Sequence, residues 1–137
     1  MTDWIMNISP MVYTRLKTEF SQKIKKKYNM TNENYSTKEI VGKPPVFPFV
    51  HVKMMPSQIT SSDLERCTIS GMDFYFQIDV FDNKSQSRAN EVMTEVIRVM
   101  VGKMKFQPKP APSLETIDDI YRMTARFERK IDYNDVL

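Results

Sequence analysis

Hydrophobic positions along the chain change their period several times, and each period predicts one kind of element. Between Pro10 and Tyr28 they recur every fourth residue, which is typical of one buried stripe on an α-helix. Ser9 and Pro10 fit the start of such a helix. The serine side chain can accept a hydrogen bond from a free amide of the first turn, and proline lacks only an N–H group that would have no partner within the helix there. The sequence therefore predicts a helix over residues 10–28.

Two later segments predict β-strands. Residues 46–55 are rich in aromatic and β-branched residues, and Pro48 places the start of this strand at a sheet edge because proline cannot donate to a ladder. Residues 72–82 alternate between apolar and polar, with one face formed by Phe74, Phe76, Ile78 and Val80. Residues 55–72 are mostly polar and predict a long connection, so the two strands are expected to pair in antiparallel fashion.

The second half of the chain predicts one more helix and a final strand. Apolar residues return to helical spacing over residues 85–101, and Gly102 supplies the C-terminal stop. Period two resumes over residues 118–132. This order predicts a single α+β domain over residues 1–137, with an antiparallel sheet of about four strands. The N-terminal helix and the central amphipathic helix are expected to pack on one face of that sheet.

Composition narrows the class of protein only slightly. Hydrophobic residues make up 41% of the chain and charged residues 27%, which is ordinary globular usage. No apolar run is long enough to span a bilayer and the N-terminus has no signal-peptide pattern, so we expect no membrane partner. The single cysteine, Cys67, excludes an internal disulfide, which agrees with synthesis in a reducing cytoplasm. A net charge of +3 is too small to indicate nucleic-acid binding.

Asp79 and Asp82 are the strongest candidates for catalytic or metal chemistry, because paired acids at a strand end can hold Mg²⁺. Strand alternation places residues 79 and 82 on opposite faces, which argues against a shared ion. The following DNKSQS segment instead predicts a turn and a helix N-cap. His51 is the only histidine, and no catalytic signature flanks it. With neither the acid pair nor His51 supported, we expect no catalytic, metal-binding or cofactor-binding residues. A metal-dependent phosphohydrolase remains the least favoured hypothesis.

Two basic features are candidates for partner contacts. The run KIKKKY at residues 23–28 ends the first predicted helix, where lysines interact favourably with the helix dipole. Arg122, Arg126 and Lys130 form an outward row on the last predicted strand, interrupted by Glu128. Either feature fits a solvated surface, a polyanion or an acidic partner, so a small nucleic-acid-binding module remains an alternative.

The order of several segments resembles one known protein family. An N-terminal helix precedes FPFV, YFQIDVFD, an amphipathic helix ending near KMKF, and a final YRMTARFERKID strand. Over residues 10–133 this pattern resembles the tail terminator, or tail completion, proteins of long-tailed bacteriophages. The resemblance implies a non-enzymatic α+β subunit that forms a ring, typically a hexamer, on the head-proximal end of the tail tube. Such a ring ends tube polymerisation and presents the surface that joins the head.

The resemblance also implies the partners and the location. The partners would be copies of the chain, the tail-tube protein and a head-completion or neck protein, with DNA only passing through the ring. The location would be the tail-neck region of the virion, after assembly in the host cytoplasm. Another neck or head-closure protein is the alternative within the same machine.

Two sets of residues are expected to make the contacts of such a ring. Arg122, Arg126 and Lys130 are the candidate lumen or partner-facing residues. The candidate subunit or tube contacts are Met54, Met55, Ile59 and Leu64, which lie beside or within the long 55–72 connection. We expect this connection to become ordered only against a neighbour.

Overall fold

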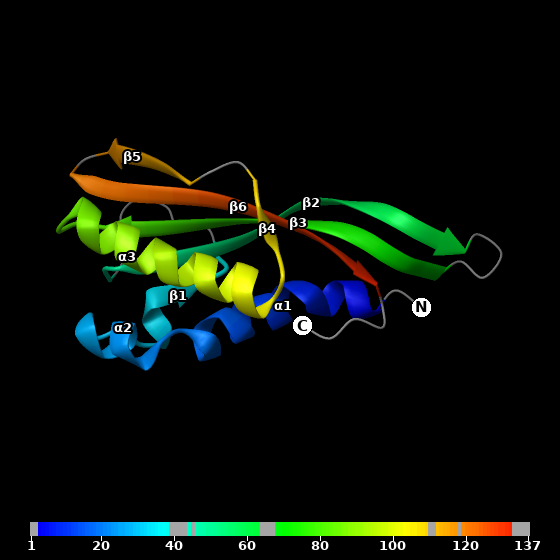
Figure 1. Cartoon of the computed structure of the whole chain (residues 1–137), viewed down its shortest axis with the longest axis horizontal. Helices are drawn as coiled ribbons and strands as arrows, with labels where there is room; N and C mark the ends of the chain where they lie inside the picture. The colour runs from blue at the N-terminus through cyan, green and yellow to red at the C-terminus, as the bar shows by residue number, and fades with distance from the viewer. Residues whose placement is uncertain are drawn as a thin grey trace.

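A long twisted sheet runs the length of the protein, and the helices lie along one side of it (Figure 1). The computed structural model describes residues 3–38, 44, 46–63, 68–109, 112–117 and 119–132. The first half contains α1 (Asp3–Glu19), α2 (Gln22–Lys27), the 3₁₀ turn η1 (Asn32–Asn34), β1 (Tyr35–Ser36), β2 (Phe49–Asp63) and β3 (Thr68–Asp82). The second half contains α3 (Gln86–Ile97), the π-helix η2 (Arg98–Lys103), β4 (Gln107–Pro108), β5 (Ser113–Ile117) and β6 (Ile120–Asp132).

The sheet confirms the α+β class but differs from the predicted arrangement. Its strand order is β1-β2-β3-β6-β4, and β5 also pairs with β6. In the described part of the chain the β1–β2 pair is parallel and the other pairs are antiparallel, so the sheet of six strands is mixed. The prediction of about four antiparallel strands was wrong because β1 and β4 span only two residues each, too few to establish a period.

The connection predicted over residues 55–72 is largely a continuation of the β2–β3 hairpin. The pairing runs from Phe49 opposite Phe81 to Asp63 opposite Thr68. Register shifts interrupt it beyond Met55, and each shift breaks the alternation on which a strand prediction depends. The predicted strand end at residue 55 was therefore wrong.

Helix α1 begins seven residues before its predicted start, and Pro10 lies inside it. Pro10 has no amide hydrogen to donate to the carbonyl of Met6, and Met6 is a residue that is 78% exposed. Burial of Ile8 extends the apolar stripe toward the N-terminus, and Trp4 packs edge-on against Phe74 with ring centroids 6.0 Å apart. This packing outweighs the propensity of Ser9-Pro10 to start a helix.

The predicted 10–28 helix is in fact two helices. Helix α1 ends at Glu19, and Ser21 caps α2 by accepting a hydrogen bond of 3.2 Å from the amide of Lys23. The amide of Ser21 itself donates to the carboxylate of Glu95 on α3. A partner that lies 74 positions away is invisible to a local pattern.

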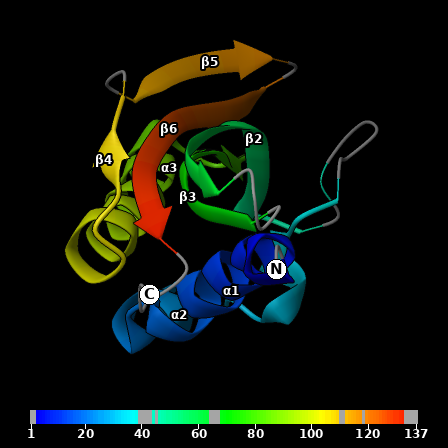
Figure 2. The ribbon, with the colours of Figure 1, turned by 90° about the vertical axis from the view of Figure 1, so that its right-hand side faces the viewer.

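The core lies between the helices and one face of the sheet, as Figure 2 shows along the long axis. The predicted inward residues of β3 and α3 are buried, and they include Phe74, Phe76, Ile78, Val80, Val92, Met93 and Val96. The helix predicted over residues 85–101 changes to a π-helix at Arg98 and continues to Lys103. The last strand begins at Ile120, and residue 118 lies outside the described residues.

Candidate functional site

The face of the sheet that points away from the helices, called here the outer face, carries a charged row on β6. Strand alternation places five residues of this row on one side, as predicted: Arg122, Thr124, Arg126, Glu128 and Lys130. Their partners across β3 are, in the same order, Phe81, Asp79, Gln77, Tyr75 and Asp73. The two strands therefore place cations, acids and neutral side chains side by side.

Asp79 is the centre of a polar cluster on the outer face. Its carboxylate is buried and accepts hydrogen bonds from Thr124 Oγ1 at 2.6 Å and from Arg122 Nε at 3.3 Å. His51 Nδ1 on β2 lies 3.8 Å from the other carboxylate oxygen. Burial opposes ionisation, but His51, Thr124 and Arg122 together lower the pKa of Asp79 to about 2. Asp79 is therefore an ionised anchor that joins three strands.

This cluster divides the predicted row of cations. Arg122 is held by Asp79, lies over the ring of Phe81 at 5.8 Å and approaches Glu115 at 3.8 Å. Arg126 is exposed and donates to Gln77 at 3.2 Å, and Lys130 is also exposed. Two of the three predicted cations are thus presented to solvent, whereas Arg122 is tied into the sheet.

The two predicted apolar contact residues whose side chains are described, Met54 and Met55, lie on opposite faces of the sheet. Met54 is 40% exposed and lies opposite Phe76 on the core side of the sheet. Met55 points to the outer face and lines a cavity of about 330 Å³ together with Tyr75. Ile59 lies in β2 opposite Met72, but its side chain is outside the described part, and Leu64 is outside the described residues altogether.

Asp82 points to the core face, away from Asp79. It pairs with Arg88 and accepts hydrogen bonds from the amides of Lys84 and Ser85 at 3.3 and 3.0 Å. Ser85 caps α3 by accepting from the amide of Arg88. The predicted turn and N-cap in DNKSQS are confirmed. Among the described residues, no group of three or more His, Cys, Asp or Glu side chains is arranged to hold a metal ion.

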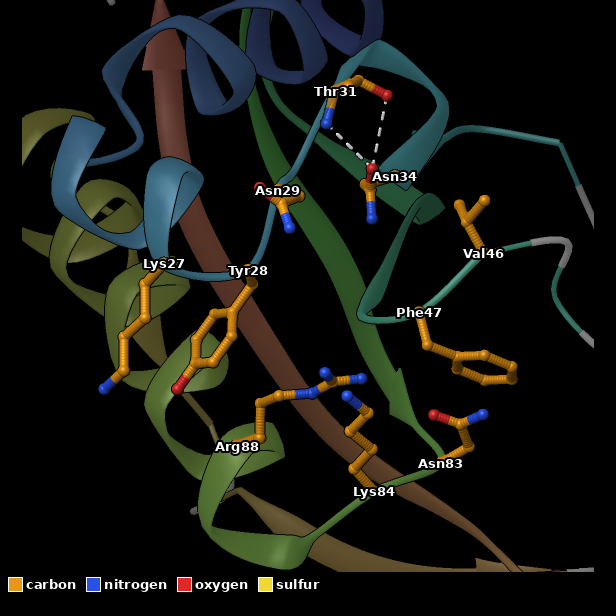
Figure 3. Close-up of a pocket in the computed structure, with 10 residues that line it drawn as sticks. All are labelled: Lys27, Tyr28, Asn29, Thr31, Asn34, Val46, Phe47, Asn83, Lys84 and Arg88. Carbon is orange, nitrogen blue, oxygen red and sulfur yellow. Dashed lines mark hydrogen bonds between the residues drawn. The ribbon is translucent and has the colours of Figure 1, made fainter.

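A cavity of about 750 Å³, called here the basic cavity, opens between the end of α2 and the β3–α3 turn (Figure 3). It is lined by Lys27, Tyr28, Asn29, Thr31, Asn34, Val46, Phe47, Asn83, Lys84 and Arg88. Sequence reasoning identified KIKKKY and DNKSQS separately but had no signal that these segments meet. Their meeting depends on how α2 packs beside α3, which no local period records.

Ionic and aromatic contacts fix one wall of the basic cavity. Lys27 Nζ lies 3.1 Å from both carboxylate oxygens of Glu91, and the hydroxyl of Tyr28 donates to the same carboxylate. The Tyr28 ring lies between Lys27 Nζ at 5.4 Å and Arg88 Cζ at 5.5 Å. Burial and Glu91 raise the pKa of Tyr28, whereas Tyr28 and Lys27 lower the pKa of Glu91.

Comparisons with known proteins do not assign a function to these surfaces. The chain matches no model of a known protein family and no curated protein sequence. Each helix in the described part of the chain is too short or too polar to span a bilayer. The functional argument therefore depends on the surfaces themselves.

Proposed function

We propose that this chain is a structural virion protein of the tail terminator type. Copies of it form a ring, a hexamer in the resembling family, on the head-proximal end of a phage tail tube. The ring stops tube polymerisation and presents the surface that a head-completion or neck protein binds. DNA only passes through the channel of the ring, whose wall does not hold the DNA tightly.

The placement of two unlike surfaces at opposite ends of the molecule is the observation that carries this proposal. The β2–β3 hairpin extends past the helices at one end of the long axis, and α2 with the start of α3 lies at the other (Figure 1). Closed rings form through head-to-tail contacts, in which each subunit offers two different patches. A projecting β-ribbon at one end and a helical surface at the other meet that requirement.

The outer face of the sheet supports the same proposal. Arg126 and Lys130 are exposed on it, with Glu128 between them. A channel for DNA needs enough positive charge to tolerate phosphates but too little to hold them tightly. A sparse, interrupted row of cations fits that need better than a continuous basic stripe does.

The alternative of a nucleic-acid-binding module has weaker support. The KIKKKY lysines belong to the helical layer, whereas Arg126 and Lys130 lie on the opposite side of the sheet. The two basic features therefore do not combine into one surface. Lys27 is also paired with Glu91.

Light scattering with electron microscopy of the purified protein is the first test. We expect a closed ring, either in solution or after addition of tail-tube protein. Persistent monomers in both conditions would overturn the ring. A salt titration with duplex DNA separates the alternative, because phosphate contacts give affinity that falls steeply with ionic strength.

Tube length distinguishes a terminator from another neck protein. Purified chain added to polymerising tail-tube protein should stop elongation and cap one end of each tube. A head-closure protein would leave tube length unchanged and bind only to tubes that are already capped. Unchanged length together with no end-bound density would contradict both roles.

A further inference from the structure

The basic cavity contains donors that the fold itself does not use. Within the described part of the chain, the ammonium of Lys84 and the side-chain amides of Asn29 and Asn83 have no hydrogen-bond or ion-pair partner. Arg88 contacts Asp82 through Nε and Nη2, which leaves Nη1 available. Solvent-accessible donors that line one cavity, and that no protein acceptor in the described part of the chain occupies, favour an oxygen-rich, anionic ligand.

Lys84 and Arg88 lie on the same side of the basic cavity. Figure 3 shows the side chains of Lys84 and Arg88 extending into the space between Tyr28 and Phe47. Asp82 pairs with Arg88 and balances its charge, whereas Lys84 has no ion-pair partner among the described residues. A phosphate group matches this site, because it brings negative charge and enough oxygens for several donors at once.

The remaining wall of the cavity is apolar and partly open. Phe47 and Val46 are half-buried on the side opposite Lys27. Because cations already lie on the Tyr28 ring, Phe47 is the aromatic surface left for stacking. The volume of about 750 Å³ falls within the range of about 300–1,000 Å³ that is usual for small-molecule sites.

We propose that the basic cavity binds a phosphate-bearing ligand of nucleotide size. Lys84 and Arg88 hold the phosphate, Phe47 stacks on the base, and Asn29 or Asn83 bonds to polar atoms of the ligand. Such a ligand is either a free nucleotide or the 5′-phosphorylated end of a DNA strand. The site belongs to the single subunit, so the proposal does not depend on ring formation.

Calorimetric titration of the full chain tests the proposal with dAMP, deoxyadenosine and inorganic phosphate. We expect dAMP to bind at least about tenfold more tightly than either fragment, because only dAMP uses both the cations and Phe47. Equal affinity for dAMP and deoxyadenosine would overturn the role of the cations. Equal affinity for dAMP and inorganic phosphate would overturn the role of Phe47.

Variants locate the binding. Lys84→Glu should weaken dAMP binding by at least about tenfold, and Phe47→Leu should weaken it by several-fold without affecting inorganic phosphate. Lys103→Glu makes the same charge change at an exposed lysine of η2, away from the cavity, and should have no effect. An unchanged melting temperature verifies folding of each variant. Equal losses in Lys84→Glu and Lys103→Glu would mean that general charge, not the cavity, governs binding.

A last set of probes identifies the source of the phosphate. A short single-stranded DNA with a 5′-phosphate that binds as well as dAMP supports a strand end, and weaker binding of that strand supports a free nucleotide. A polyglutamate peptide that binds more tightly than dAMP would overturn the proposal in favour of an acidic protein partner.

Discussion

The carboxylate of Glu95 on α3 accepts a hydrogen bond of 2.9 Å from the backbone amide of Ser21, between α1 and α2. The guanidinium of Arg98 donates to the same oxygen, through Nε at 2.9 Å. Burial opposes ionisation of Glu95, but Arg98 and Ser21 lower its pKa below the ordinary value. One buried carboxylate thus fixes the break between two helices to a third.

Glu95→Ala should destabilise the protein by about 1–3 kcal/mol, because it leaves the Ser21 amide without its acceptor and Arg98 without its partner. Glu95→Gln keeps an oxygen acceptor for Ser21 and should cost less than half as much. Denaturant unfolding of the two variants measures the difference. Equal losses would show that charge, and not the hydrogen bond to Ser21, holds the helix break.

Local periodicity predicts the elements whose burial is decided by their own sequence. The alternation of Phe74 to Val80 identifies the core face of β3. The helical spacing of Val92 to Met100 identifies the core face of α3 and of η2, which follows it, because each side chain points either toward the helix–sheet interface or away from it. The break at Ser21 and the bulged half of β2 depend on contacts far along the chain. Those features could not be predicted from a single segment.

For the candidate surfaces too, the sequence predicts local features but not contacts between distant segments. Period two correctly places Arg122, Arg126 and Lys130 on one face. It cannot show that Asp79 withdraws Arg122 from that set, because the pairing depends on which strand lies beside β6. The basic cavity was missed for the same reason, since its walls come from separate segments.

Arg122 and Arg126 provide a matched test of which cations on β6 stabilise the fold and which are only presented to solvent. Arg122→Gln should cost about 1–3 kcal/mol of unfolding free energy, because buried Asp79 loses its cation. Arg126→Gln should change stability by less than about 0.5 kcal/mol, because exposed pairs contribute little. Denaturant unfolding at neutral pH measures both changes. A loss in Arg126→Gln as large as in Arg122→Gln would contradict the separate roles.

Replacement by phenylalanine should affect stability differently at Tyr13 and at Tyr35. The hydroxyl of Tyr13 donates to the carbonyl of Tyr35 at 2.9 Å, so Tyr13→Phe should cost about 1 kcal/mol. The hydroxyl of Tyr35 is buried without a partner in the described part of the chain, so Tyr35→Phe should be neutral or stabilising by up to about 1 kcal/mol. Thermal unfolding measures both effects, and a destabilised Tyr35→Phe would reveal a partner for that hydroxyl.

Acid should remove the stability that Asp79 provides. The pKa of Asp79 falls from 3.8 in the unfolded chain to about 2 in the folded one, so the folded state favours the ionised carboxylate. Its contribution is complete above pH 3.8 and disappears as the pH falls through about 2. The stability difference between wild type and Asp79→Asn should therefore be constant near neutral pH and shrink over that acidic interval.

Thr124→Val refines the acid prediction, because it removes the 2.6 Å hydrogen bond to Asp79 and keeps the carboxylate. Without that donor the folded-state pKa of Asp79 should rise, so the loss of stability on acidification should begin at a higher pH than in wild type. Urea unfolding over a series of acidic buffers measures this shift. If the advantage of wild type over Asp79→Asn persists undiminished at the lowest pH, the carboxylate stabilises the fold through shape and packing and not through its charge.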